Sequence, residues 1–110
     1  MKQYVIDEIR PADYDKLKAY LDDAFGREAM DGLYWMPLDS DLLSDVQRSH
    51  PACAPFYLAL ELGEDRLTGE LLVRTHQRVR CDCIGYADAR QRDWLIGRMD
   101  AIFEKLGIIF

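Results

Sequence analysis

The 110-residue sequence has no long apolar run, and no window reaches the length that a membrane-spanning helix requires. Residues 1–8 also lack the apolar stretch of a secretory signal. Cysteine is scarce and odd in number, so the three cysteines cannot all pair in intramolecular disulfides. Together these absences predict a reducing, cytoplasmic location and no membrane partner.

The common catalytic motifs are absent too. The sequence contains no phosphate-binding Walker loop, no dinucleotide-binding glycine pattern, no His-Glu-x-x-His and no Gly-x-Ser-x-Gly. Each of these motifs places a reactive or ligand-binding group by a known local geometry. Their absence favours a non-catalytic role.

The sequence has fewer basic than acidic residues, 14 against 20, and its net charge is −6. A nucleic-acid-binding domain is usually basic, since it must neutralise phosphates. Arg74, Arg78 and Arg80 cluster near an expected turn, with Tyr86 close enough in sequence to stack on a base. The acidic remainder would repel a phosphate backbone, so the charge balance argues against a nucleic-acid partner.

The composition is that of one folded domain. Apolar residues make up 49% of the chain and charged residues 31%, an ordinary mixture for a globular protein. Repeats, low-complexity tracts and linkers rich in proline, glycine or serine are absent from the sequence. We therefore expect a single domain over residues 1–110.

Apolar residues spaced by three and four predict three helices. The first and last have a polar opposite face and clear stop signals, whereas the second is shorter. The helices are expected from Pro11 to a stop at Gly26, from a cap at Asp39 or Ser40 to a stop at Pro51, and from a cap at Asp88 to a stop at Gly107.

Alternating apolar residues predict strands, which are expected over residues 3–9, 56–62, 67–75 and 79–86. Residues 27–38 form either an edge strand or a loop, and residues 108–110 are prone to form a last strand. The pattern predicts an α+β fold, with an antiparallel sheet of three to five strands that includes a C-terminal meander, and two or three helices packed on one face. One variant of this layout resembles the ferredoxin-like βαββαβ arrangement with an inserted helix.

The most unusual group of side chains is His50, Cys53, Cys81 and Cys83. Zinc is bound tetrahedrally by thiolates and imidazoles, and short-spaced pairs provide its ligands two at a time. Two alternatives stay open: the cysteines pack as small apolar residues in the core, or Cys53 or Cys81 is a reactive thiol activated by His50 or His76. The absence of Cys-x-x-Cys pairs favours packing over a zinc site.

An aromatic run offers a candidate contact surface. Tyr34, Trp35 and Met36 follow one another, and Tyr57 falls on the polar side of an expected strand. Such residues are enriched where proteins anchor partners, although they also close hydrophobic cores. The leading hypothesis is therefore a non-catalytic module that binds a protein partner or a second copy of itself. The alternative is the metal-binding or thiol-active protein described above.

Overall fold

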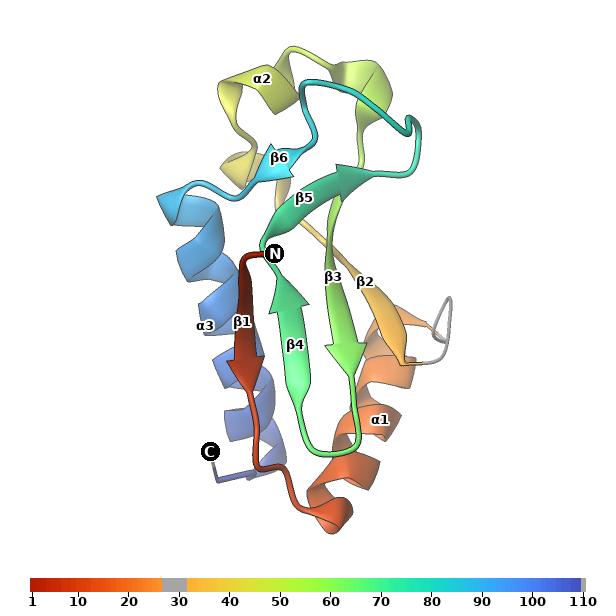
Figure 1. Ribbon diagram of the computed structural model, residues 1–110, viewed down its shortest axis with the longest axis vertical. Helices are drawn as coiled ribbons and strands as arrows, with labels where there is room; N and C mark the ends of the chain where they lie inside the picture. Colours follow the sequence, from red (N-terminus) through yellow and green to blue (C-terminus); the bar gives the residue numbers. More distant parts are fainter. Residues whose placement is uncertain (27–31, 110) are drawn as a thin grey trace.

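An antiparallel sheet and two long helices make up most of the molecule, in a computed structural model that describes residues 1–26 and 32–109 (Figure 1). The strands are β1 (Gln3–Ile6), β2 (Leu33–Pro37), β3 (Phe56–Leu62), β4 (Leu67–Glu70), β5 (Leu72–Thr75) and β6 (Gly85–Tyr86). The helices are α1 (Pro11–Phe25), α2 (Asp45–Arg48) and α3 (Ala89–Leu106), with 3₁₀ turns η1 (Ser40–Leu42) and η2 (Pro51–Cys53). In the described part of the chain, no helix combines the length and apolarity needed to cross a membrane.

The sheet is centred on β3, which pairs with β2 along one edge and with both β4 and β5 along the other. The register changes between the two pairings: Leu60 lies opposite Gly69, whereas Tyr57 lies opposite Arg74. Two residues of β3 therefore face four residues of the other strand, which is a bulge. This bulge divides the expected strand 67–75 into β4 and β5, which pair outward with β1 and β6 respectively.

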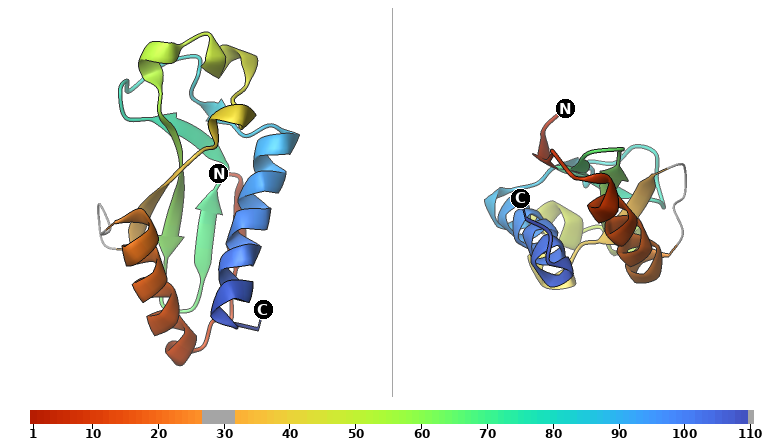
Figure 2. Two further views of the ribbon diagram at one scale, coloured as in Figure 1. Left: turned by 180° about the vertical axis from the view of Figure 1, so that it is seen from behind. Right: turned by 90° about the horizontal axis from the view of Figure 1, so that it is seen from below.

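Helices α1 and α3 cover the same face of the sheet, as Figure 2 shows from behind and from below. Side chains of α3 pack closely over Gly69 of β4, so a larger residue at this position would require them to shift. A Cβ there would lie 2.5 Å from the sulfur of Met99 and 3.1 Å from Leu95. Within the described residues no helix packs over the opposite face of the sheet.

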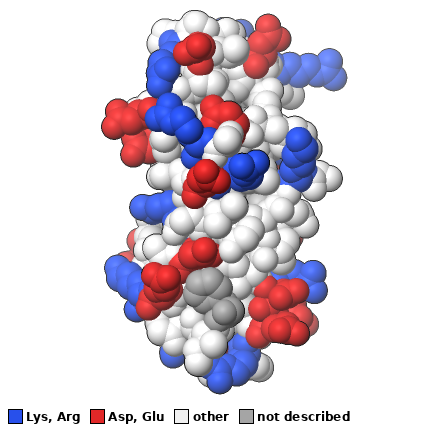
Figure 3. All heavy atoms as spheres, turned by 90° about the vertical axis from the view of Figure 1, so that its left-hand side faces the viewer, with Lys and Arg blue, Asp and Glu red and all other residues white. Residues whose placement is uncertain are grey.

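The η1, α2 and η2 segments, the loop 76–84 and β6 gather at one end of the long axis, which measures 43 Å (Figures 1 and 2). We call this part the cap. Charges of both signs are interspersed on the side of the molecule formed by α3 and β1 (Figure 3). That distribution is typical of solvated surfaces.

The α+β fold with an antiparallel sheet is confirmed, and the first and third helices have the expected bounds. The Ser44 and Asp88 side chains cap α2 and α3. At the end of α3, Gly107 adopts the left-handed conformation and the Ile108 amide donates to the Phe103 carbonyl.

Several expectations differ from the structure. The second helix is divided, because Leu43 is extended and separates η1 from α2. The expected strand 79–86 is reduced to Gly85–Tyr86, and Ile108–Ile109 forms no strand; Phe110 lies outside the described residues. The strand order departs from the ferredoxin-like arrangement, since β1 lies at an edge and no described strand follows α3.

In the ambiguous segment 27–38, residues 33–37 form the edge strand β2, and residues 27–31 lie outside the described part.

Candidate metal centre

Two short segments of the cap each contribute a pair of candidate ligands. His50 precedes η2 and Cys53 is its last residue, and the Cys53 amide donates to the His50 carbonyl over 2.9 Å. Side chains three apart in a 3₁₀ turn project to the same side. Pro51 occupies the first position of the turn, where its missing N–H costs nothing. The sequence His-Pro-Ala-Cys therefore presents an imidazole and a thiol together.

Cys81 and Cys83 lie in a tight turn rather than on a strand. The Ile84 amide donates to the Cys81 carbonyl over 3.0 Å, which closes a four-residue turn. The strand expected over residues 79–86, which would have placed both thiols on one face, therefore does not form at these positions. The turn nevertheless brings both sulfurs to one side, because it reverses the chain between them.

The four ligand atoms of these two pairs all lie within 4.8 Å of one another. Nδ1 of His50 is 2.9 Å from Sγ of Cys81, and Sγ of Cys53 is 3.8 Å from the same sulfur. With Zn–S bonds of about 2.3 Å, two thiolates of a tetrahedral zinc are about 3.8 Å apart. The Cys53–Cys81 spacing matches this edge, and the widest pair needs to close by only about 1 Å.

The four side chains differ in exposure. Cys53 and Cys83 are buried, whereas His50 and Cys81 are partly exposed. In the free thiols, backbone and side-chain hydrogen bonds with Cys83 lower the pKa of Cys81 to about 7. Burial is the main cause that raises the pKa of Cys83 to about 12. A bound cation would favour the thiolate at every position, because metal ligation deprotonates a thiol.

Buried side chains hold the backbone of both segments. The Thr75 hydroxyl donates to the Cys53 carbonyl, and the Gln47 amide nitrogen donates to the Cys83 carbonyl over 3.3 Å. Gln47 is itself fixed by Gln91 at the start of α3, whose amide nitrogen donates to the Gln47 side-chain oxygen over 2.9 Å. The two pairs are thus anchored to β5 and α3 independently of any ion.

Two arginines border the cluster. Arg78 and Arg80 line the same shallow depression as His50, Cys53 and Cys81, and both are exposed. Three thiolates around a divalent cation carry a net charge of about −1, which nearby guanidinium groups would offset.

The sequence singled out the four residues that converge here, although it favoured core packing over a metal site, and it missed the buried side chains that hold them. Gln47, Thr75 and Gln91 are all buried polar residues. A signal for the two glutamines was present, since Ser44-x-x-Gln47 and Asp88-x-x-Gln91 both have capping-box spacing, and both boxes form. Nothing in the sequence marks Thr75.

The aromatic run divides between the two faces of the sheet. Tyr34 and Met36 point toward the helices and are 1% and 0% exposed, so they belong to the core and not to a contact surface. Their burial follows from the alternation of β2, which turns Trp35 to the uncovered face. Trp35 and Tyr57 are both partly exposed there and contact each other edge to face.

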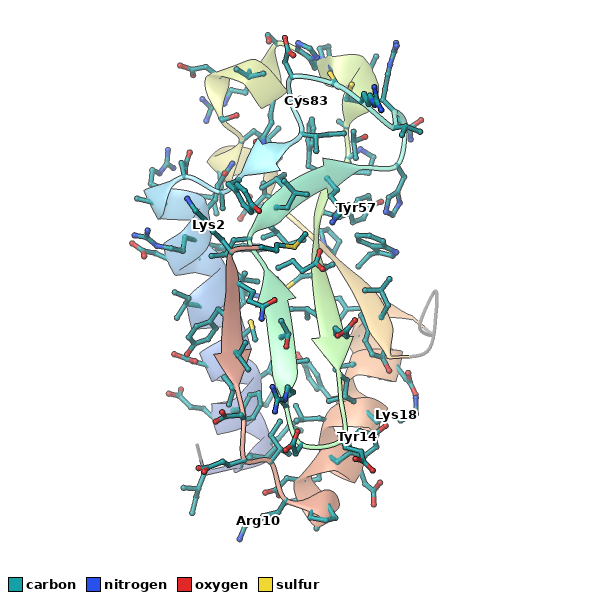
Figure 4. All side chains as sticks on the ribbon, in the orientation of Figure 1. Lys2, Arg10, Tyr14, Lys18, Tyr57 and Cys83 are labelled. Carbon is teal, nitrogen blue, oxygen red and sulfur yellow. The ribbon has the colours of Figure 1, made fainter. Side chains whose placement is uncertain are left out.

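His76 joins Trp35 and Tyr57 rather than the cysteines. Its ring stacks on Tyr57 with centroids 4.3 Å apart and meets Trp35 edge to face at 4.7 Å. In Figure 4, Cys83 lies in the cap, and Tyr57 lies where β3 passes β5. His50 therefore belongs to the cysteine cluster, whereas His76 belongs to the aromatic cluster.

Comparisons of the chain with protein-family models, with curated proteins and with solved structures give no match.

Proposed function

We propose that the chain is a zinc-binding module in which Nδ1 of His50 and the sulfurs of Cys53, Cys81 and Cys83 hold one structural zinc ion. The observation that carries the proposal is the convergence of these four atoms within 4.8 Å, from segments about 30 residues apart in sequence. A set of one imidazole and three thiols is a common structural zinc set.

The role of the ion would be structural rather than catalytic. Four protein ligands fill a tetrahedral coordination sphere and leave no position for water or substrate. The ion would tie η2 to the turn 81–84, two segments of the cap that have little regular structure of their own. Binding energy at such a site contributes directly to folding.

The expected reducing, cytoplasmic location belongs to the same proposal. The three cysteines are free thiols in the structure. A reducing compartment keeps thiols available to a metal and prevents competing disulfides between Cys53 and Cys81.

The thiol-active alternative has less support. His50 contacts Cys81, as a nucleophile and its base would. Within the described residues, however, no carboxylate hydrogen-bonds to His50 to orient it. His76 cannot act as the base, because it packs against Trp35 and Tyr57.

The interaction-module hypothesis remains a second candidate, narrowed to Trp35 and Tyr57. The observation that favours it is the cluster of Trp35, Tyr57 and His76 on the sheet face that no described helix covers. Aromatic rings of this kind anchor protein partners or a second copy of a chain.

The chain's two histidines offer a matched test of the zinc site. We expect wild-type protein to bind one zinc per chain in competition with a chromophoric chelator. His50→Gln should weaken zinc binding at least about tenfold, because it removes a ligand. His76→Gln removes the other imidazole without touching the site and should leave zinc affinity unchanged.

Two results would contradict the proposal. One is a wild-type chain that takes up no zinc from the chelator. The other is an equal loss of affinity in His50→Gln and His76→Gln. Alkylation of Cys81 adds a second readout, because this thiol is partly exposed without zinc: zinc should protect it from alkylation until a strong chelator is added.

A further inference from the structure

We infer that a second site, between the uncovered sheet face and the loop 76–84, binds a small organic oxyanion: a phosphate or carboxylate carried on a single planar ring. The site is a pocket of about 360 Å³, near the lower end for small-molecule sites. Trp35, Arg74, His76, Arg78, Val79 and Ile84 are among the residues that line it. None of them is a candidate metal ligand, although Arg78 also borders the metal cluster, and the inference does not depend on whether that cluster binds zinc.

The charge of the pocket selects an anion. Arg74, Arg78 and His76 are among its lining residues, and no aspartate or glutamate is. This is unusual in a chain with a net charge of −6. A concave site lined by one sign of charge concentrates ligands of the opposite sign.

Arg74 is incompletely paired. Its Nη2 donates to Glu70 over 3.2 Å across the sheet face. Its Nε is buried and has no hydrogen-bond acceptor in the described part of the chain. A guanidinium presents five N–H donors in a fixed fork that suits phosphate and carboxylate oxygens. Nε itself does not open into the pocket, but the Arg74 side chain is 35% exposed, so other N–H groups of the same fork can meet an oxyanion there.

The apolar lining favours a ring beside the charged group. Trp35 forms one wall, and the stack of His76 on Tyr57 holds its position. Val79 is 94% exposed, although it is a large apolar side chain. A planar ring placed between Trp35 and Val79 would cover both while its oxyanion reaches the arginines. A bare anion would leave this apolar surface in water.

Trp35 provides the readout. Trp94, the other tryptophan, lies on α3 beside Arg98, so a Trp94→Phe background leaves Trp35 as the only reporter. We expect phenyl phosphate to change the Trp35 fluorescence saturably. Inorganic phosphate and phenol should each bind about tenfold more weakly, because each lacks one half of the ligand. Benzoate, tested alongside, decides whether carboxylate replaces phosphate.

Val79 allows a charge test that does not threaten folding, because its side chain is almost fully exposed. Val79→Glu places a carboxylate at the rim and should weaken phenyl phosphate binding about tenfold or more. Val79→Gln introduces an uncharged side chain of the same shape as glutamate and should weaken binding far less. Arg78→Gln should also weaken it about tenfold, and Arg92→Gln on α3 should have no effect. The inference is overturned if neither phenyl phosphate nor benzoate gives a saturable change in Trp35 fluorescence. It is also overturned if Val79→Glu and Val79→Gln bind phenyl phosphate with the same affinity.

Discussion

The side-chain nitrogen of Gln47 donates to the backbone carbonyl of Cys83, 36 residues away in the sequence. Gln47 is only 4% exposed, and its side-chain oxygen accepts from Gln91. A glutamine that also closes the capping box of α2 thus joins α2, α3 and the cysteine turn. Because the turn carries two candidate ligands, its position depends on this buried amide.

Gln47→Leu tests that dependence. The change removes the donor to the Cys83 carbonyl and one of the two acceptors of the Gln91 side-chain nitrogen, which keeps its bond to the Leu42 carbonyl. Losing these buried hydrogen bonds should cost about 1–3 kcal/mol of unfolding free energy. Zinc affinity should fall about 10- to 100-fold, as it does when groups that orient metal ligands are removed. Urea unfolding and zinc competition measure the two effects. Asp45→Ala, an exposed change on the same helix, is the control; equal zinc affinity in Gln47→Leu and wild type would contradict the role of Gln47.

Cys83→Ala separates the zinc site from simple core packing, because Cys83 is both buried and a candidate ligand. In metal-free protein the change removes one small buried atom and should cost only about 1 kcal/mol. In zinc-loaded protein it should cost at least about 1.4 kcal/mol more, the equivalent of a tenfold weaker zinc affinity. Thermal unfolding with and without zinc measures the difference. The same cost in both conditions would leave Cys83 as a packing residue only.

Gly69→Ala tests the close approach of α3 to the sheet. The new methyl group would overlap Met99 and crowd Leu95, so we expect a loss of about 1–3 kcal/mol in unfolding free energy. Gly97→Ala is the matched control, since a Cβ there meets nothing within 4 Å and the position is inside α3. It should gain up to about 1 kcal/mol from helix propensity. If both variants are stabilised, α3 does not pack against β4 as described.

The neighbours Tyr34 and Trp35 should respond very differently to truncation. Tyr34→Ala empties a core position and removes the hydroxyl that donates to Asp22 over 2.6 Å, so it should cost about 3–5 kcal/mol. Trp35→Ala removes a partly exposed ring from the uncovered face and should cost no more than about 2 kcal/mol. Denaturant midpoints compare the two. A larger cost for Trp35→Ala would contradict the assignment of the two faces of β2.

The long elements could be predicted because their signals are local and agree. In α3, the apolar spacing, the Asp88 cap and the Gly107 stop all indicate the same bounds. The bounds of the second helix were harder to predict, because residues 39–50 contain two helix N-cap residues, Asp39 and Ser44, with an extended Leu43 between them. The prediction of a strand over residues 79–84 was wrong for a different reason. Its alternating residues fit a strand, yet the bond from Ile84 to the Cys81 carbonyl makes a turn.

The candidate site was predictable by residue type but not by position. The spacing of His50 and Cys53 indicated one pair and that of Cys81 and Cys83 another. Nothing local could show that the pairs meet, because that depends on Thr75 and Gln47 holding their carbonyls. The same limit applied to His76, whose place beside Trp35 and Tyr57 follows from the register of β3 with β5.

The most direct test of the zinc proposal is X-ray absorption at the zinc edge, on protein purified without chelator or affinity metal. The four converging side chains predict about one zinc per chain, with three sulfur neighbours at about 2.3 Å and one nitrogen at about 2.0 Å. Protein that holds no zinc, or zinc surrounded only by nitrogen and oxygen, would contradict the account. In that case Cys53 and Cys83 are core residues, and the favoured function becomes partner binding through the surface around Trp35.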